Sequence, residues 1–433
     1  MGRMLLWSVG ALLLIVGANI NDPFLMRFRF WCLAAMAVIW VAGMWTVARK
    51  QGGAARHLLL LVWLGIPCAV AAAQGALAWR QLVVMSADAE VARLVGRHFM
   101  IGYDSFDDAA PLVRRGLVGG LYVTRRNLEG RSAAELGAEI ARLQDIRKAE
   151  GLPPLLVATD QEGGTVSHLS PALTALPPLA SVADMPAPLR HAAARDYGAQ
   201  HGRELAALGI NVNFAPVVDL QVPHPPSLLD WNSRIGKRAI SGDPAVVGQV
   251  ALGYARGLAE AGVRPTVKHF PGMGRVTADT HVFRATLATP KDELARSDWQ
   301  PFRDLLSASD AMVMVGHVVV SDIDPDRPAS HSRRVIDGVL RGEWGFDGPI
   351  ITDDLVMGAV YHHGLCTAVE EALNAGVDLL LVAYDGRQYY RAMGCALTAL
   401  GQGRLDSATL TRSETRLARV HRPAPLDMAS AAP

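Results

Sequence analysis

Residues 268–281 have the sequence KHFPGMGRVTADTH, which brings two histidines, a lysine and an aspartate within one short segment. Asp279 precedes His281 by two residues, a spacing at which a carboxylate can orient an imidazole and stabilise its charged form during proton transfer. Taken alone, this spacing also fits a surface hydrogen bond. Pro271 fixes the entry to a turn, and the glycines that follow permit backbone conformations closed to other residues. The segment therefore predicts an acid–base pair on a mobile loop.

A pair of aspartates follows a short apolar segment further along the chain. Residues 349–352 are apolar or small and are bounded by glycine and acids, which predicts a buried parallel strand with Asp353 directly after its C-terminal end. Packing does not require two adjacent aspartates there, although one of the two commonly caps the next helix. We assign the cap to Asp354 and the chemistry to Asp353.

Such strands recur and alternate with helices. Eight segments predict strands, at residues 98–102, 119–123, 155–159, 212–217, 265–268, 311–317, 349–352 and 378–382. Helical patterns lie between them, most clearly at residues 132–150, 189–208, 244–261, 291–307 and 368–375. This alternation predicts an α/β fold of the (β/α)₈ barrel type, for which about 250 residues are typical.

Chemistry in such barrels takes place at the C-terminal ends of the strands. The titratable residues found at the ends of the predicted strands are Asp160, Lys268, His269, His317 and Asp353. Acids and bases that serve only solubility would not gather at one rim. For His317, a packed and hydrogen-bonded residue of the rim is an equally good interpretation.

The segment at 268–281 closely resembles the signature of glycoside hydrolase family 3, in its bacterial β-N-acetylglucosaminidase branch, where a histidine replaces the usual carboxylic acid/base. Four further segments are similar to blocks of that family: LLVATDQEGG at 155–164, GINVNFAPVVD at 209–219, RIGKR at 234–238 and GFDGPIITDDLVM at 345–357. The resemblance extends over about residues 89–417.

The resemblance implies double displacement with retention of configuration. Asp353 would form a covalent glycosyl-enzyme intermediate, His281 would protonate the leaving oxygen and then activate water, and Asp279 would hold the histidine tautomer. By the same resemblance, the sugar is held by Asp160, Arg238, Lys268 and His269. The implied substrate is a glycan with terminal β-linked N-acetylglucosamine, of peptidoglycan type, and the chemistry needs no metal and no organic cofactor.

Three positions depart from the family pattern. After Gly163 and Gly164 the family usually has Arg-Val-x-Arg, whose second arginine contacts the sugar, but here Thr165 and His168 stand in the arginine positions. Met273 stands where many members have histidine. The loss of a planar cation removes a bidentate clamp on sugar hydroxyls. The preferred sugar is therefore open, and His168 becomes the candidate contact.

Three functions fit these residues. The first is a membrane-tethered β-N-acetylhexosaminidase. The second is a glycoside phosphorylase or transglycosylase, because a histidine acid/base lacks the carboxylate charge that repels phosphate. The third is a non-catalytic glycan sensor, which loss of Asp353 or His281 would favour; both residues are present.

The first 83 residues are of a different kind. Residues 4–20, 31–47 and 58–77 are apolar and uncharged, and about twenty helical residues span a bilayer core. The first stretch also fits the core of a signal peptide, but no small-residue cleavage site follows it. We expect three transmembrane helices, a barrel at 84–421 and a disordered tail at 422–433.

Basic residues orient these helices. With the N-terminus inside, the cytoplasmic side holds Arg3, Arg49, Lys50 and Arg56, and the first external loop holds Arg27 and Arg29. This bias favours an inside N-terminus. Three spans then put the barrel on the periplasmic or extracytoplasmic side of a multi-pass membrane protein, and the side is reversed if one stretch lies in the membrane interface instead.

Composition agrees with an anchored globular enzyme. Half of the residues are hydrophobic, and a net charge of +1 without a basic tract argues against a nucleic-acid partner. Cys32 and Cys68 lie in predicted spans. Cys366 and Cys395 lie in the predicted barrel without zinc-type spacing, so they neither require nor exclude an oxidising compartment.

Overall fold

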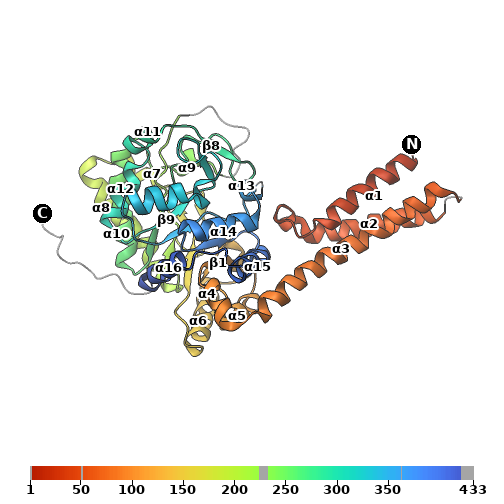
Figure 1. Cartoon of the computed structure of the whole chain (residues 1–433). Helices are drawn as coiled ribbons and strands as arrows, with labels where there is room; N and C mark the ends of the chain where they lie inside the picture. The colour runs from red at the N-terminus through yellow and green to blue at the C-terminus, as the bar shows by residue number, and fades with distance from the viewer. Residues whose placement is uncertain (1, 50–51, 224–232, 362, 421–433) are drawn as a thin grey trace. The chain divides into compact units, whose positions relative to one another are not determined.

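The computed structural model describes residues 2–49, 52–223, 233–361 and 363–420, and it divides the chain into two units (Figure 1). The first unit comprises residues 1–87 together with 387–394, and the second comprises residues 88–386 together with 395–433. Lys50 and the predicted tail at 422–433 lie outside the described residues.

Parallel strands form the centre of the second unit. Within the described residues, eight strands make one sheet: β1 (Phe99–Gly102), β2 (Gly120–Tyr122), β3 (Leu156–Thr159), β6 (Val212–Asn213), β7 (Arg264–Phe270), β9 (Met312–Val315), β11 (Ile350–Thr352) and β12 (Leu380–Val382). Their order is β11-β9-β7-β6-β3-β2-β1-β12. A parallel bridge between Ile351 and Leu379 connects the two outer strands. The predicted α/β fold is confirmed as a nearly closed barrel of parallel strands.

Every predicted strand is present, with changed limits. Strand β6 is shorter than predicted, and β7 extends two residues beyond the predicted end at Lys268 because Phe270 still pairs with Val315 of β9. The strands are apolar on both faces because one face packs inside the barrel and the other against helices. The interior cluster includes Met100, Leu156, Ala158, Val212, Met312, Met314, Ile351 and Leu381.

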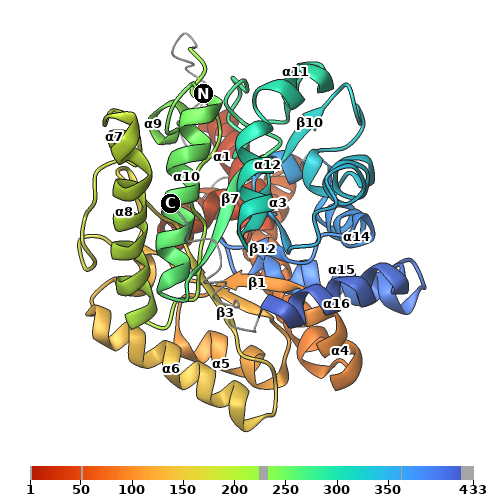
Figure 2. The ribbon, with the colours of Figure 1, turned by 90° about the vertical axis from the view of Figure 1, so that its left-hand side faces the viewer.

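Helices surround these strands, and Figure 2 shows α6, α8, α10 and α12 around them. The helices after residue 88 are α4 (Ala89–Gly96), α5 (Phe106–Arg115), α6 (Ala133–Ala149), α7 (Ala180–Ala183), α8 (Ala187–Ala207), α9 (Ile235–Arg238), α10 (Pro244–Glu260), α11 (Lys291–Arg296), α12 (Gln300–Ala308), α13 (Gly358–Tyr361), α14 (Leu365–Ala375), α15 (Gln388–Gly401) and α16 (Ser407–Val420). Shorter elements are η2 (Arg125–Leu128), η3 (Ala329–His331), the π-helix η4 (Arg334–Glu343), β4 (Gln161–Gly163), β5 (Val166–Ser167), β8 (Ala285–Leu287) and β10 (Val318–Val320).

One predicted helix is divided in two. Residues 291–307 were expected to be continuous, but α11 ends at Arg296 and α12 begins at Gln300. Pro301 lies in the first turn of α12, a position where its missing N–H costs nothing, whereas inside a longer helix it would break the hydrogen-bond ladder. The prediction of a single helix was therefore wrong.

Cys366 of α14 and Cys395 of α15 form a disulfide within the second unit. The sequence spacing alone did not predict this bond. Disulfides persist in oxidising compartments and are rare in the cytosol.

The first unit contains α1 (Gly2–Ala18), η1 (Pro23–Phe28), α2 (Arg29–Ala48) and α3 (Ala54–Ser86). Its helices pack around Trp63, which is buried and whose backbone carbonyl accepts a hydrogen bond of 2.7 Å from Trp40 Nε1. Among the described residues, Pro23–Ala48 and Ala54–Ser86 are long and apolar enough to cross a membrane, and Met4–Ala18 is a shorter apolar helix.

Candidate active site

Asp353 and Asp354 follow β11 directly and have different partners. Asp354 accepts backbone N–H groups from Val356 (3.1 Å), Ala383 (3.1 Å) and Tyr384 (2.7 Å). Burial raises the pKa of Asp354 to about 6. Asp353 Oδ1 accepts the Asp354 N–H at 2.8 Å. Asp354 thus binds backbone groups, but those of its own turn and of the segment after β12, not the first turn of α13, which begins at Gly358.

His281 lies in the connection between β7 and β8 and is held by Asp279. Asp279 is fully buried, and its Oδ1 accepts both the His281 backbone N–H (2.9 Å) and the proton on His281 Nδ1 (2.8 Å). The His281 side chain remains 42% exposed, so Nε2 is the ring nitrogen that is free to exchange protons. The predicted contact between Asp279 and His281 is therefore present, and its tautomer suits a general acid/base; the catalytic role stays a prediction.

Backbone contacts join the loop of His281 to the segment after Asp353. Gly358, the first residue of α13, donates its N–H to the His281 carbonyl at 2.8 Å. A Cβ atom on Gly358 would lie 2.4 Å from the carbonyl oxygen of Val282, so only glycine permits this approach. The contact brings the acid–base loop to the end of β11.

The charges of Asp353 and His281 interact. Burial opposes ionisation of Asp353, but His269 and His281 hold its pKa below the usual range of an aspartate. Burial lowers the pKa of His281, but the hydrogen bond that its ring donates to Asp279 and the charge of Asp353 outweigh burial and raise the pKa. Asp353 is therefore ionised and His281 readily protonated near neutral pH, which is the state needed for nucleophilic attack with acid assistance.

A buried network of ion pairs lies at the ends of β3 and β7. Lys268 is 2% exposed and pairs with both Asp160 and Glu162, the latter at 2.6 Å. Arg238 binds Glu162 through two hydrogen bonds of 2.7 and 3.0 Å. Although burial opposes ionisation, Lys268 holds the pKa of Asp160 low, and Arg238 and Lys268 do the same for Glu162. The network therefore brings two cations and two carboxylates together at one end of the barrel strands.

His269 lies beside this network and is oriented by Asp219. Its Nδ1 donates to Asp219 at 2.7 Å, so its Nε2 is the acceptor for Arg238 at 3.4 Å. Asp219 also accepts the backbone N–H groups of His269 (3.2 Å) and Met273 (2.6 Å). The predicted loop thus begins as strand and is fixed at Met273, and Gly272 has the positive φ (104°) expected of it. The mobility of the loop stays a prediction.

His168 is joined to the network through a residue that sequence reasoning did not identify. Tyr122, at the end of β2, donates its hydroxyl to Asp160 and lies 3.2 Å from His168 Nδ1. Burial lowers the pKa of His168, so it contributes a neutral ring where the family usually has an arginine. Thr165 is exposed.

His317 is fully buried and has both ring nitrogens engaged. Its Nδ1 lies 2.7 Å from Ser330 Oγ and its Nε2 lies 2.9 Å from the carbonyl oxygen of Asp354. The structure therefore favours a packed residue of the rim, the second of the two interpretations of this histidine.

The predicted site residues come together in two groups. One group holds the residues predicted to carry the acid–base and nucleophilic chemistry, Asp353, His281 and Asp279. The network holds those predicted to bind the sugar, Asp160, Arg238, Lys268, His269 and His168. Sequence reasoning missed Tyr122, Glu162 and Asp219. Glu162 and Asp219 were visible as acids within the quoted family segments, whereas Tyr122 gave no signal beyond its place at the end of a strand.

Comparison with known proteins gives one family. A model described as the glycosyl hydrolase family 3 N-terminal domain matches residues 81–420. The chain is 37% identical over 273 residues to a β-hexosaminidase of Nitrosomonas eutropha, which covers 62% of this chain and 74% of the relative. It is 38% identical over 275 residues to a β-hexosaminidase of Pseudomonas aeruginosa, which covers 63% and 77%.

Solved structures of similar fold belong to the same kind of enzyme. A family 3 β-N-acetylglucosaminidase from a Paenibacillus species superposes with a TM-score of 0.70 and 34% identity over 79% of this chain, and the chain covers 64% of that longer protein. A β-N-acetylhexosaminidase from Beutenbergia cavernae superposes with a TM-score of 0.69 and 29% identity, covering 78% of this chain and 99% of that one.

Proposed function

The chain belongs to glycosyl hydrolase family 3 and is a glycosidase of the β-hexosaminidase type, and from this we propose that it is a retaining, membrane-anchored β-N-acetylhexosaminidase acting on peptidoglycan-type glycans. One observation carries the mechanism. Asp353 directly follows β11, and Gly358, five residues later, donates its N–H to the carbonyl of His281, whose ring is oriented by Asp279.

In the proposed reaction, a carboxylate oxygen of Asp353 attacks the anomeric carbon while the proton on His281 Nε2 passes to the glycosidic oxygen. The bond to the leaving group breaks and an ester to Asp353 forms. Water then enters, gives its proton to His281 Nε2 and cleaves the ester, so two inversions restore the original configuration. Asp279 keeps Nδ1 protonated in both steps and stabilises the imidazolium.

The network supplies substrate binding in this proposal. Asp160 and His269 Nε2 would accept hydrogen bonds from sugar hydroxyls, and Lys268 and Arg238 would donate to the ring substituents. Because Glu162 already binds Arg238 through two nitrogens, the guanidinium is held in one orientation before the sugar arrives. His168, in the usual arginine position, would face the same ring with a neutral side chain.

The membrane part of the proposal rests on the first unit. Large apolar side chains are exposed along all three helices, among them Leu12, Ile15, Trp31, Val38, Trp45, Leu61 and Leu64. A surface of this kind in water is costly, and lipid would cover it. We propose that α1, α2 and α3 each cross the bilayer, with α1 short enough to lie near the lower limit of a span.

Three crossings from an inside N-terminus would put the barrel outside the cytoplasm. The disulfide between Cys366 and Cys395 supports this side, because the sulfur atoms would stay reduced in the cytosol. The glycan that such a barrel meets is that of the cell wall, which is why we propose peptidoglycan-type chains with terminal N-acetylglucosamine.

The test is an assay of the purified full chain on aryl β-glycosides that differ only at the 2-position, with and without phosphate. We expect release to be fastest with the 2-acetamido sugar and to be unchanged by phosphate. A rate that rises with phosphate and gives sugar phosphate would favour the phosphorylase. Binding without turnover would favour the sensor, and a preference for a 2-hydroxyl would contradict the proposed substrate.

A further inference from the structure

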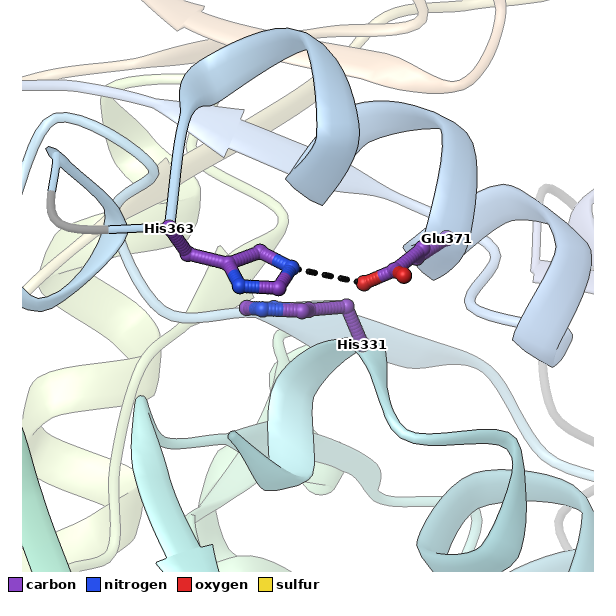
Figure 3. Close-up of side chains that lie close together, drawn as sticks. All are labelled: His331, His363 and Glu371. Carbon is purple, nitrogen blue, oxygen red and sulfur yellow. Dashed lines mark hydrogen bonds and ion pairs between the residues drawn. The ribbon is translucent and has the colours of Figure 1, made fainter. Parts of the chain in front are cut away.

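Two histidines and a glutamate form a cluster that the proposed mechanism does not use (Figure 3). His331 ends η3, His363 lies between α13 and α14, and Glu371 lies within α14. One potential ligand atom from each residue lies within 4.8 Å of the other two, and this is the one such group of three found among the described residues. Figure 3 shows the ring of His331 lying against that of His363, with 4.6 Å between their centres.

A chain of hydrogen bonds from the active site defines the tautomer of His331. The carbonyl oxygen of Asp354 can only accept, so His317 Nε2, 2.9 Å away, carries a proton. Burial lowers the pKa of His317, so the ring is neutral and its Nδ1 is a bare acceptor. The Ser330 hydroxyl, 2.7 Å from that nitrogen, must therefore donate to it.

The same logic continues to His331. Since the Ser330 proton points to His317, the Ser330 oxygen accepts from His331 Nδ1, which lies 3.0 Å away. A neutral His331 then has its lone pair on Nε2. That atom is fully buried and has no hydrogen-bond partner among the described residues. Leaving a buried acceptor unsatisfied costs about 1–3 kcal/mol, so a ligand with positive charge or a proton to donate is expected there.

We propose that His331, His363 and Glu371 bind a divalent transition-metal ion of the zinc type. Two imidazole nitrogens and one carboxylate oxygen are a donor set that Zn²⁺ accepts, with a fourth position left for water. The Nδ1–H of His331 would rest on Ser330, as metal-bound histidines usually donate their second nitrogen to a neighbouring oxygen. The ion would take the place of the proton now shared between His363 Nε2 and Glu371 Oε2 at 2.7 Å.

Binding requires the His363 ring to turn out of its stack on the His331 ring, because the two ring planes are 34° apart and the lone pair of an imidazole nitrogen lies in the plane of its ring. Ligand atoms about 2.1 Å from a tetrahedral ion lie about 3.4 Å apart, so the cluster would contract by roughly 1.4 Å at most. His363 can move, because it lies in a connection and its side chain is 20% exposed. Arg327 donates to the other oxygen of Glu371 at 2.8 Å, and its positive charge opposes a cation. That opposition is weak because the Arg327 side chain is 43% exposed to solvent.

The position of the cluster indicates a structural role. Through Ser330 and His317, His331 is linked to the carbonyl of Asp354, next to the proposed nucleophile. His363 follows α13, whose first residue, Gly358, holds the loop of His281. An ion that joins η3 to the start of α14 would therefore fix both sides of the active site without contacting the sugar.

The test uses the full-length protein, stripped with a chelator, exposed to Zn²⁺ and freed of unbound metal by gel filtration. Metal content is then measured by mass spectrometry. We expect the wild type to retain one ion at this cluster. His363→Ala and Glu371→Gln should bind the ion at least a hundredfold more weakly and therefore lose it during gel filtration. Co²⁺ in place of Zn²⁺ should give the visible absorption of a tetrahedral site in the wild type and not in these variants.

Two controls separate this site from others. His191→Ala removes a histidine on α8 outside the cluster and should retain the ion. His281→Ala removes any binding by the active site itself and should also retain it. Three results would each overturn the proposal. The wild type could hold no ion, His363→Ala and Glu371→Gln could retain it unchanged, or only His281→Ala could lose it.

Discussion

Asp353 and Asp354 are neighbours in the chain, but their surroundings shift the pKa values of their carboxyl groups in opposite directions. Asp354 accepts three backbone N–H groups, yet burial raises its pKa to about 6. Asp353 is also buried, yet the histidines around it hold its pKa below the usual range. This difference supports the proposal that Asp353 is the nucleophile and that Asp354 supports the backbone around it.

Replacing His281 by alanine should affect substrates according to their leaving groups. General acid–base assistance is worth about 10²–10⁴-fold, and an activated aryl leaving group needs little of it in the first step. We expect the rate with substrates that have poor leaving groups to fall by most of that factor. The rate of the first step with activated aryl substrates should fall much less. Steady-state rates over a leaving-group series measure this, and equal losses throughout would make His281 only structural.

Asp279→Asn should shift the pH profile. The carboxylate of Asp279 helps to raise the pKa of His281 despite burial, and the protonated ring is the acid of the first step. Activity therefore falls on the alkaline side as the ring loses its proton. Without the charge of Asp279 the pKa falls, so the alkaline limb of kcat/KM should move to lower pH. An unmoved limb with reduced activity would show that the limb belongs to another group.

The architecture was predictable to the extent that it depends on apolar patterns. Strands of a parallel barrel are continuous apolar segments, so all eight could be located, and their C-terminal ends gave the rim where Asp160 and Asp353 lie. Strand limits could not be predicted, because pairing with a neighbour decides them. Phe270 remains in β7 only because it pairs with Val315.

The contacts within the site depend on tertiary structure and could not be read from the sequence. Tyr122 is thirty-eight positions from Asp160 but donates its hydroxyl to it, and Asp219 reaches His269 across fifty positions. The disulfide between Cys366 and Cys395 likewise joins residues that are 29 positions apart in the chain. Short-range spacing identified Asp279 and His281 because that contact lies within two residues.

Glu162→Gln should destabilise the fold. The variant leaves Lys268 and Arg238 buried with one charge fewer to balance them, and breaking a buried pair by removing one partner typically costs about 3–5 kcal/mol. The midpoint of thermal unfolding of the full chain in detergent should fall by several degrees. The matched control is Glu260→Gln, which breaks the exposed pair with Arg195 and should change stability by about 0–1 kcal/mol. Equal effects of the two variants would contradict the role given to Glu162.

The proposed topology predicts the behaviour of C-terminal reporters. If α1, α2 and α3 all cross and Arg49 and Arg56 stay inside, a reporter active only beyond the cytoplasm should work when fused after the barrel. Mass spectrometry under non-reducing conditions should also find Cys366 linked to Cys395. Activity of a cytoplasmic reporter would mean an even number of crossings, and the cell-wall-facing role would give way to an inward-facing recycling enzyme.

The central claim is that Asp353 forms the covalent intermediate, and trapping that intermediate tests it most directly. A 2-fluoro sugar with a good leaving group forms the glycosyl-enzyme faster than water removes it, so peptide mass spectrometry should find the sugar on Asp353. Asp353→Asn should carry no adduct and lose at least about 10³-fold in turnover, since an amide cannot form the ester. A sugar found on Asp354 or Glu162, or full turnover by Asp353→Asn, would contradict the account.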